Sequence, residues 1–382
     1  MMVSLIGTWV QALAQSWLVF QLTNSAFLLG FVGFLGAFPI FLLSLFGGVL
    51  ADRLNKKNIL IVTQIAFMIL AFILAILTQF KLITPFQIMV IAVLNGIVMA
   101  FDAPSRQSVV VELVGRVHLP NAIALNSVAF NSSRIIGPAI AAILVATIGM
   151  SGCFYLNGIS FLAVIIALLA IQVNTPVKPK NRSTAFKELK DGLLFVRNHR
   201  TILILMIMVG VVSLFGVAYV ILMPLFADNV LKVGVQGLGM LMSFAGGGAL
   251  IGALILARLG DFKYKGKFLV ASSFIFSFSL IIFALSKAYV VSLITLIFLG
   301  GSSVTAIALV NTLLQTSVSD EFRGRVMSVF MLIFAGITPF GNLIAGSLAE
   351  GLGVSAALLL NGIICTVFFA IINIRYPEIR KI

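Results

Sequence analysis

Long apolar segments recur along the whole chain, and they constrain its fold more than any other feature. Each holds roughly 20 or more residues with few charges, the length that a helix needs to cross the hydrocarbon core of a bilayer. Hydrophobic residues make up 61% of the 382 positions and charged residues only 9%. A water-soluble protein of this composition would expose large apolar patches and aggregate. The chain is therefore predicted to be an all-α integral membrane protein.

Twelve segments are long and apolar enough to span a membrane. They fall near residues 3–22, 27–50, 58–80, 84–103, 121–148, 151–172, 201–227, 235–257, 266–286, 288–314, 325–349 and 353–374. Most breaks between them carry turn or charged residues, such as Thr84-Pro85. Gly149 alone separates the fifth span from the sixth, and a single glycine there predicts a tight connection.

Basic residues mark one side of these spans. If the chain begins in the cytoplasm, nearly all of its 25 Lys and Arg residues lie in inner connections, and the outer connections hold only Lys81, Lys232 and Lys287. Cytoplasmic loops carry this excess, so we expect both termini in the cytoplasm and the protein in the cytoplasmic (inner) membrane. The formal charge of +14 then belongs to membrane loops. No nucleic-acid partner is expected, because that would need a basic face among ordinary polar surface.

Residue patterns that bind metals or cofactors are scarce. Cys153 and Cys365 lie in apolar stretches, where buried free thiols are expected rather than a disulfide or a metal site. The glycine run 246–248 lies within a span and no Gly-Lys-Ser/Thr follows it, so with Gly252 it predicts a small-residue packing face instead of a phosphate-binding loop. We expect no metal, no cofactor, no enzymatic activity and no ATP-driven motor in this chain.

The sequence also repeats itself at a shift of 204 residues. Residues 137–159 match residues 341–363. The same shift pairs Gly149 with Gly353, Asn157 with Asn361, Gly48 with Gly252, and Asn24 with Asp228. Six spans return a chain to the same side of the membrane, so the repeat predicts two parallel six-helix halves, 1–172 and 201–382, around a central site. Residues 173–200 are predicted to join them as a cytoplasmic linker with an amphipathic helix, capped by Ser183-Thr184, at the membrane surface.

A loop signature follows the second span. Its members are Gly48, Asp52, Arg53, Asn55, Lys56 and Lys57. It resembles the inner-loop motif of the major facilitator superfamily, which usually has glycine in place of Asn55; asparagine tolerates the left-handed backbone expected at the turn. We expect a latch at the inner gate, in which Gly48 allows close helix contact and Arg53 pairs with a carboxylate such as Asp102. The alternative is a turn that carries positive-inside charges and nothing more.

Longer segments narrow the resemblance. Residues 7–26, 101–141 and 313–353 resemble the branch of the superfamily that contains the enterobactin exporter and macrolide efflux proteins. The resemblance covers nearly the whole chain and implies proton-driven export of small organic molecules. Members of that branch have more residues before the Gly-Thr-Trp of the first span, so we expect this chain to be truncated or its start to be misassigned.

The resemblance further implies that the first helix of each three-helix group lines a central cavity. At about 1.5 Å per residue, several polar residues fall near mid-depth on these four helices: Gln11, Asn95, Ser213, Ser302 and Ser303, with Gln15 one turn beyond Gln11. Such side chains line a water-filled path, or they form hydrogen bonds between helices. Both alternatives stay open for each residue. A lining of this kind carries no code for one substrate.

Arg134 lies inside the fifth span, just before Gly137-Pro138. An arginine within the membrane is costly and marks a functional site with a partner. The nearest candidates are Asn131 and Asp102, or the substrate itself; structural anchoring is the alternative. No span has an acid at mid-depth, so proton coupling is expected from Asp102, Arg134 and the resemblance.

The sequence therefore predicts a monomeric secondary active transporter that exports small amphipathic organic molecules, drugs or a siderophore, in exchange for protons. Two alternatives stay open. One is an importer or a lysophospholipid flippase of the same fold. The other is a membrane scaffold or sensor that transports nothing, although such a protein would not need a latch motif.

Overall fold

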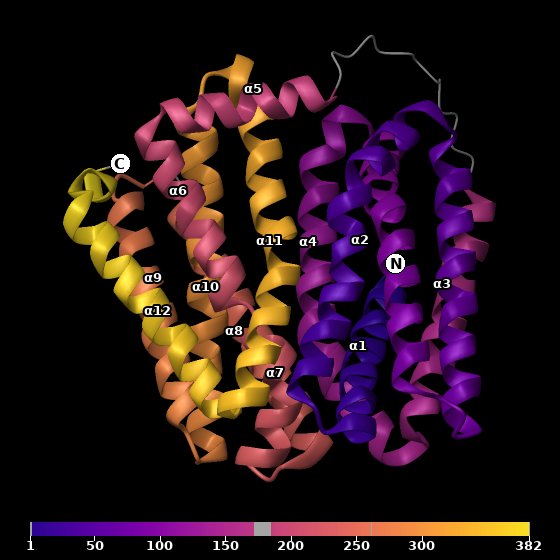
Figure 1. The fold of residues 1–382 in the computed structure, drawn as a ribbon. Coiled ribbons are helices and arrows are strands. Elements are labelled where there is room, and N and C mark those ends of the chain that lie inside the picture. The colour runs from indigo at the N-terminus through magenta and orange to yellow at the C-terminus, as the bar shows by residue number, and fades with distance from the viewer. Residues whose placement is uncertain (1, 172–184, 261, 382) are drawn as a thin grey trace. The chain divides into compact units, whose positions relative to one another are not determined.

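A computed structural model describes residues 2–171, 185–260 and 262–381 (Figure 1). Every regular element within these residues is a helix. The elements are α1 (Met2–Thr23), α2 (Ala26–Arg53), α3 (Lys56–Gln79), α4 (Pro85–Ala170), α5 (Ala185–Asn198), α6 (Arg200–Val211), the π-helix η1 (Val212–Gly216), α7 (Tyr219–Leu225), the π-helix η2 (Phe226–Val230), α8 (Gly234–Leu259), α9 (Lys265–Leu285), α10 (Tyr289–Ser317), α11 (Asp320–Leu352), α12 (Val354–Arg375) and the 3₁₀-helix η3 (Pro377–Lys381).

Eleven helical segments among the described residues are long and apolar enough to cross a membrane. One of them, Leu125–Ala170, has 46 residues, about twice the length that one crossing needs. The chain turns back inside it. A Cβ on Gly137 would lie 2.5 Å from Trp9 Cβ, and a Cβ on Gly7 would lie 2.5 Å from Asn157 Oδ1. Residues 137 and 157 therefore pack on the same stretch of α1, although a straight helix would separate them by about 30 Å.

Gly149 makes this reversal possible. Its φ is +74°, in the region that glycine enters without a steric penalty. The long segment is thus two spans joined by a tight connection, and the prediction of twelve membrane-spanning helices is confirmed. Gly353 has the same role between α11 and α12, with a φ of +85°, as the shift of 204 residues predicts.

The chain groups into two compact units. The N-terminal unit comprises Met1–Asn24, Val32–Asn181 and Val235–Ser243, and the C-terminal unit comprises Ser25–Phe31, Arg182–Gly234 and Phe244–Ile382. The first turns of α2 are thus grouped with the C-terminal unit and those of α8 with the N-terminal unit. In each of these two segments a glycine lies close to another helix of the unit to which the segment is assigned. A Cβ on Gly30 would lie 2.4 Å from Asn342 O on α11, and one on Gly239 would lie 2.4 Å from Ala142 Cβ on α4.

Close glycine contacts hold helices together within each unit. In the N-terminal unit, a Cβ on Gly96 would lie 2.3 Å from Gly36 O, and one on Gly47 would lie 2.1 Å from Ala100 O. Small residues let backbones approach in this way. Gly48, which the motif predicts as the contact residue, has no such neighbour within 4 Å. That prediction is wrong by one position, because neighbouring residues of a helix point about 100° apart.

The C-terminal unit repeats the pattern. A Cβ on Gly248 would lie 2.0 Å from Ile297 O, and one on Gly252 would lie 2.4 Å from Gly301 O on α10. The predicted small-residue packing face on α8 is confirmed. Gly48, which the shift of 204 residues matches with Gly252, has no close contact of this kind among the described residues.

The offset between matching residues of the two halves changes at this point, because the seventh span is longer than the first. Its apolar segment, Arg200–Val230, has 31 residues, against 22 for α1. Two π-helical turns, η1 and η2, interrupt it, and such turns accommodate extra residues within a helix. The left-handed residue that precedes α2 is Asn24, with φ +46°, whereas before α8 it is Lys232, with φ +56°. The predicted match of Asn24 with Asp228 is therefore displaced along the chain.

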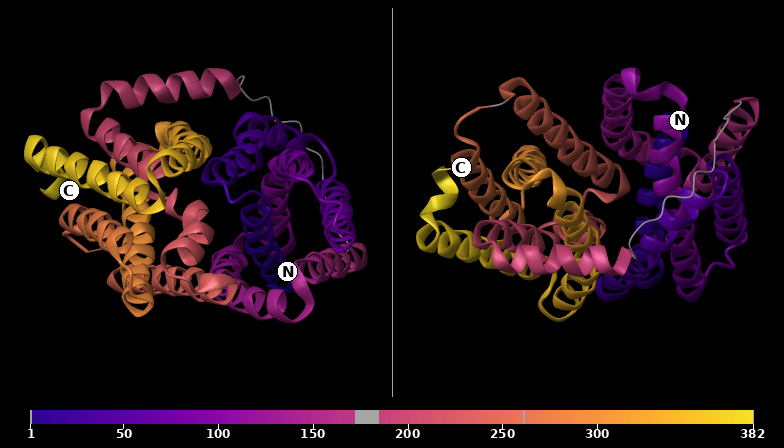
Figure 2. Two further views of the ribbon diagram at one scale, coloured as in Figure 1. Left: turned by 60° about the horizontal axis from the view of Figure 1, so that its bottom comes forward. Right: turned by 90° about the horizontal axis from the view of Figure 1, so that it is seen from above.

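The predicted amphipathic helix exists as α5, while its proposed caps Ser183 and Thr184 lie outside the described residues. Within the C-terminal unit, α5 crosses the first turns of α11 (Figures 1 and 2). The rings of Phe195 and Phe322 stack with centroids 4.6 Å apart. A Cβ on Gly192 would lie 2.7 Å from Arg325 O, so the two helices touch at their backbones.

Candidate functional site

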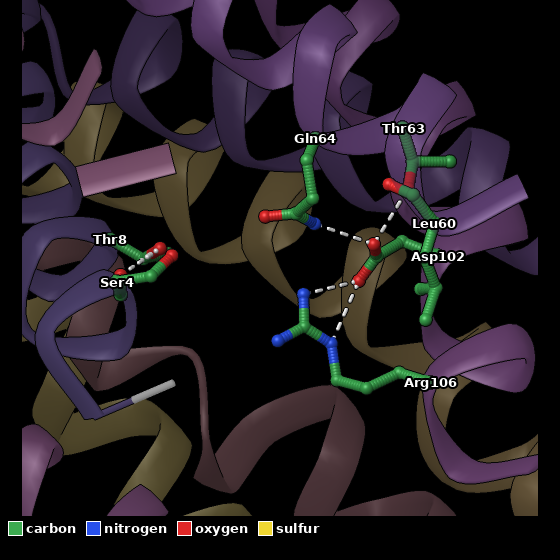
Figure 3. Close-up of polar contacts among 7 residues, drawn as sticks. All are labelled: Ser4, Thr8, Leu60, Thr63, Gln64, Asp102 and Arg106. Carbon is green, nitrogen blue, oxygen red and sulfur yellow. Dashed lines mark hydrogen bonds and ion pairs between the residues drawn. The ribbon is translucent and has the colours of Figure 1, made fainter. Parts of the chain in front are cut away.

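Asp102 is the centre of a buried polar cluster in the N-terminal unit. Its side chain, on α4, is almost fully enclosed, with 1% of the residue exposed. Arg106 lies one helical turn further on, and its Nη2 and Nε atoms lie 2.7 and 3.1 Å from Asp102 Oδ2 (Figure 3). Oppositely charged side chains four residues apart meet on one helix face. The pair brings a titratable carboxylate into the interior of the unit, where a charge needs a partner.

Helix α3 supplies the other donors of the cluster. Thr63 Oγ1 and Gln64 Nε2 each lie 2.8 Å from Asp102 Oδ1. Both carboxylate oxygens are therefore bonded, one by the guanidinium and one by two neutral groups (Figure 3). Two buried atoms beside them, Gln64 Oε1 and Ser105 Oγ, have no hydrogen-bond partner among the described residues. Oxygen atoms that could accept a further hydrogen bond thus lie in the same cluster as the Asp102 carboxylate.

These contacts differ from the ones that the loop motif predicts. Asp102 was the candidate partner of Arg53, but its oxygens bond Arg106, Thr63 and Gln64. The backbone of α2 includes Asp52 and Arg53, while their side chains lie outside the described part of the structure. The latch remains a prediction.

The rest of the motif makes contacts within the N-terminal unit. Asn55 is the N-cap of α3: its side-chain oxygen accepts from the backbone N–H groups of Lys57 and Asn58, and its φ of −66° is not left-handed. Asn55 acts here as a helix cap, so the expected left-handed turn is wrong. Lys56 forms an ion pair with Glu112. Lys57 Nζ donates to Ile171 O at 2.6 Å and to Leu169 O at 3.3 Å, and so caps the end of α4.

A second polar cluster joins α1 to the last part of α4. Asn157 Nδ2 donates to Gln11 Oε1 at 2.7 Å, and Ser160 Oγ lies 3.1 Å from Asn157 Oδ1. All three residues are buried. For Gln11 the hydrogen bond between helices is therefore the role that the structure shows. Gln15 and Asn95 are half-buried, and neither makes a side-chain hydrogen bond within the described residues.

The predicted path residues of the C-terminal unit differ in whether their hydroxyl groups are hydrogen-bonded. Ser302 and Ser303 bond carbonyl groups of their own helix, Phe298 O at 2.6 Å and Gly300 O at 2.9 Å. Ser213 lies in the π-helix η1, and its Oγ is buried without a partner among the described residues. The same holds for both polar side-chain atoms of Asn361 on α12. Asn361 is the repeat counterpart of Asn157, but Ile364 replaces Ser160.

Arg134 is partly buried on α4. Within the described residues it makes no hydrogen bond and no ion pair. Neither predicted protein partner bonds it there: Asp102 is paired with Arg106, and the one bond of the Asn131 side chain within the described residues is from its Nδ2 to Ser127 O, at 2.8 Å. Binding of the substrate and structural anchoring therefore both stay open as roles for Arg134.

Four residues of these clusters were not identified from the sequence. Arg106 stands four residues after Asp102, a spacing that predicts an ion pair on a helix. Thr63 and Gln64 carry no comparable signal, because their contact with Asp102 depends on how α3 packs on α4. Asn157 is visible only as a repeated residue, paired with Asn361.

The site has no features of a metal or redox centre in the described residues: no group of His, Cys, Asp and Glu side chains could hold a metal ion, and both cysteines are free and buried. A bundle of helices that are long and apolar enough to cross a membrane defines an integral membrane protein. The family follows from comparison. A family model described as "Transmembrane secretion effector" matches residues 1–381, so the chain belongs to this family of the major facilitator superfamily.

Relatives agree with this assignment. The chain is 28% identical to the staphyloferrin A transporter of Staphylococcus aureus, over 96% of this chain and 93% of that protein. It is 25% identical to macrolide efflux protein A of Streptococcus pyogenes, over 100% and 95%. It is 21% identical to the multidrug efflux pump Tap of Mycolicibacterium fortuitum, over 98% and 93%. The predicted membership of this branch is confirmed.

Solved structures show the same fold. A bacterial homologue of the human lysosomal transporter Spinster superposes with a TM-score of 0.76 at 14% identity, covering 99% of this chain and 96% of that one. A D-xylose–proton symporter gives a TM-score of 0.75 at 12% identity, covering 96% and 95%. The predicted twelve-helix major facilitator fold is confirmed, and the protein is a transporter rather than an enzyme.

Proposed function

We propose that this protein exports small amphipathic organic molecules from the cell in exchange for protons, by alternating access. Relatives that match almost the whole chain are named for efflux of macrolides and of multiple drugs and for transport of a siderophore. In this proposal the protein works as a monomer in the cytoplasmic membrane, with both termini in the cytoplasm, as the distribution of basic residues favours.

The observation that carries proton coupling is the enclosed carboxylate of Asp102. A proton on Asp102 removes the charge that holds Arg106 and turns one carboxylate oxygen from an acceptor into a donor. Gln64 presents a buried oxygen that has no partner among the described residues, and this oxygen can accept the new hydrogen bond once the amide rotates. Binding and loss of one proton thus changes the contact between α3 and α4, and this change is the proposed link to the inner gate.

Other residues supply the path and the gate in this proposal. The candidates for contact with the solute are the predicted path residues whose side chains make no hydrogen bond within the described residues, namely Gln15, Asn95, Arg134 and Ser213. Asp52 and Arg53 form the inner latch, so Asp52→Asn is expected to slow the transport cycle without changing which molecules are carried. A changed substrate profile would count against the latch.

Inverted membrane vesicles with an imposed pH gradient test the function. Vesicles that contain the wild-type protein should accumulate a macrolide or ethidium when the lumen is acidic, and dissipating the gradient should stop the uptake. Vesicles with Asp102→Asn should equilibrate the solute but not concentrate it. Transport of labelled lysophospholipid alone would favour the flippase, and uptake in right-side-out vesicles alone would favour an importer. Absence of flux in every arm would support a non-transporting scaffold.

A further inference from the structure

Arg134 lies on a face of α4 that carries one aromatic side chain, Phe130, and packs against another, Trp9 of α1. Phe130, Arg134 and Gly137 are spaced four and three residues apart, which places them on one side of the helix. Both neighbours contact Trp9 on α1. The rings of Trp9 and Phe130 meet edge to face with centroids 6.2 Å apart, and a Cβ on Gly137 would lie 2.5 Å from Trp9 Cβ. The guanidinium therefore belongs to the same helix face as an aromatic pair.

Within the described residues of its unit, no acid neutralises the charge of Arg134. The N-terminal unit contains three acids, Asp52, Asp102 and Glu112. Asp102 is paired with Arg106 and Glu112 with Lys56. The side chain of Asp52 lies outside the described part of the structure, and its place on α2 is the last turn of that helix, whereas Arg134 lies well inside the span Leu125–Ala170.

An arginine in a membrane span is stable when an anion, backbone carbonyl groups or water take up its five donors. We infer that Arg134 binds the anionic group of a transported molecule, and that amphipathic aromatic carboxylates are among the substrates. A carboxylate accepts two parallel N–H bonds from a guanidinium. The apolar body of such a molecule fits the aromatic pair beside Arg134, where Phe130 is 46% exposed. This inference rests on the proposed function and narrows its substrate class.

Equilibrium binding to the purified protein in detergent tests the inference without any gradient. The probes are 2-naphthoate and 2-naphthamide, which have nearly the same shape and differ in charge. The wild type should bind naphthoate more tightly than naphthamide. Arg134→Gln should weaken naphthoate binding by about tenfold or more, the usual effect of losing a hydrogen bond to a charged group, and leave naphthamide binding unchanged. Arg134→Lys should recover part of the loss, and Arg258→Gln, at the end of α8, should have no effect.

A measurement on the wild type covers the case in which Arg134→Gln does not fold. Phenylglyoxal modifies accessible arginines, and mass spectrometry of the peptide that contains Arg134 reports the extent. Naphthoate should protect Arg134 from modification, and naphthamide should not. Equal binding of the two probes, unchanged naphthoate binding in Arg134→Gln, or absence of protection would each overturn the inference. Because none of these readouts involves flux, failure of proton-driven export in vesicles would leave the binding result intact.

Discussion

Two guanidinium nitrogens of Arg106 meet a single carboxylate oxygen of Asp102, at 2.7 and 3.1 Å, one turn apart on α4. The other carboxylate oxygen bonds to α3. The arginine is the more exposed partner, with 26% of its side chain accessible against 2% for the aspartate. A proton that reaches this carboxylate therefore acts on an ion pair and on a helix contact at once.

Asp102→Asn is expected to uncouple transport from the proton gradient, because an amide can fill the same space but cannot bind and release the proton. It also leaves Arg106 without its anion, which lowers stability. The double variant Asp102→Asn/Arg106→Gln should recover the thermal unfolding temperature without recovering gradient-driven transport. Glu112→Gln is the matched control: it breaks a more exposed ion pair with Lys56, so it should change stability little and keep coupling. Gradient-driven accumulation in Asp102→Asn at the wild-type level would contradict the role of Asp102.

The two repeated asparagines are expected to respond in opposite ways to replacement by leucine. Asn157 bonds Gln11 and Ser160, so Asn157→Leu leaves buried polar groups without partners and should destabilise the protein by about 1–3 kcal/mol. Asn361 is equally buried but has no partner among the described residues, so Asn361→Leu should be neutral or stabilising. Thermal unfolding of the two purified variants in one detergent gives the comparison. A larger loss for Asn361→Leu than for Asn157→Leu would show that Asn361 has a partner essential to the fold.

Gly149→Ala is expected to destabilise the hairpin between the fifth and sixth spans. A Cβ there meets no neighbouring atom within 4 Å, so the cost, about 1–2 kcal/mol, comes from the left-handed backbone alone. Gly351→Ala is the control, since this glycine is helical and its Cβ also meets open space; it should be neutral or slightly stabilising. Thermal unfolding of both variants checks this. Equal stability would mean that the connection at Gly149 tolerates another backbone conformation.

Glu350→Ala is expected to loosen the first turn of α2. Glu350 Oε2 accepts from Ser25 Oγ and from Phe27 N–H, both at 3.0 Å, so a carboxylate at the end of α11 caps a helix that begins more than 300 residues earlier. Loss of hydrogen bonds to a charged group should speed amide exchange in Phe27 and Leu28 by roughly tenfold. Hydrogen–deuterium exchange with mass spectrometry reports this region. Glu321→Ala, at the other end of α11, should leave it unchanged, and unchanged exchange in Glu350→Ala would show that the cap does not hold the turn.

The spans and the hairpin at Gly149 could be predicted from hydropathy and one glycine, because a bilayer imposes the length of each apolar segment. The face of each helix could not. Gly47 rather than Gly48 makes the close contact with α4. The two glycines are adjacent on one helix, and apolar composition does not indicate which of them faces α4. The match of Asn24 with Asp228 is displaced because π-helical turns lengthen the seventh span, and no residue pattern marked them.

The candidate site could be predicted from the sequence only in part, because the residues that bond Asp102 were not identified. Asp102 and Arg134 could be identified because each is a charged residue within an apolar segment, and this is visible in the sequence itself. Which donor reaches Asp102 depends on the packing of α3 against α4, over 38 and 39 residues of sequence. For Gln11 the sequence left two roles open, a solute path and a hydrogen bond between helices. Its oxygen accepts from Asn157, because a buried amide satisfies its polar atoms where a neighbouring helix offers a partner.

Proton movement in proteoliposomes tests the central claim most directly. The purified protein is reconstituted with a pH-sensitive dye in the lumen, at equal pH on both sides, and a macrolide gradient is imposed by rapid dilution. We expect the macrolide to leave down its gradient and the lumen to acidify in the wild type, because an antiporter moves protons against the solute. With Asp102→Asn the lumen pH should stay constant. Macrolide flux by the wild type with no change in lumen pH would contradict proton exchange.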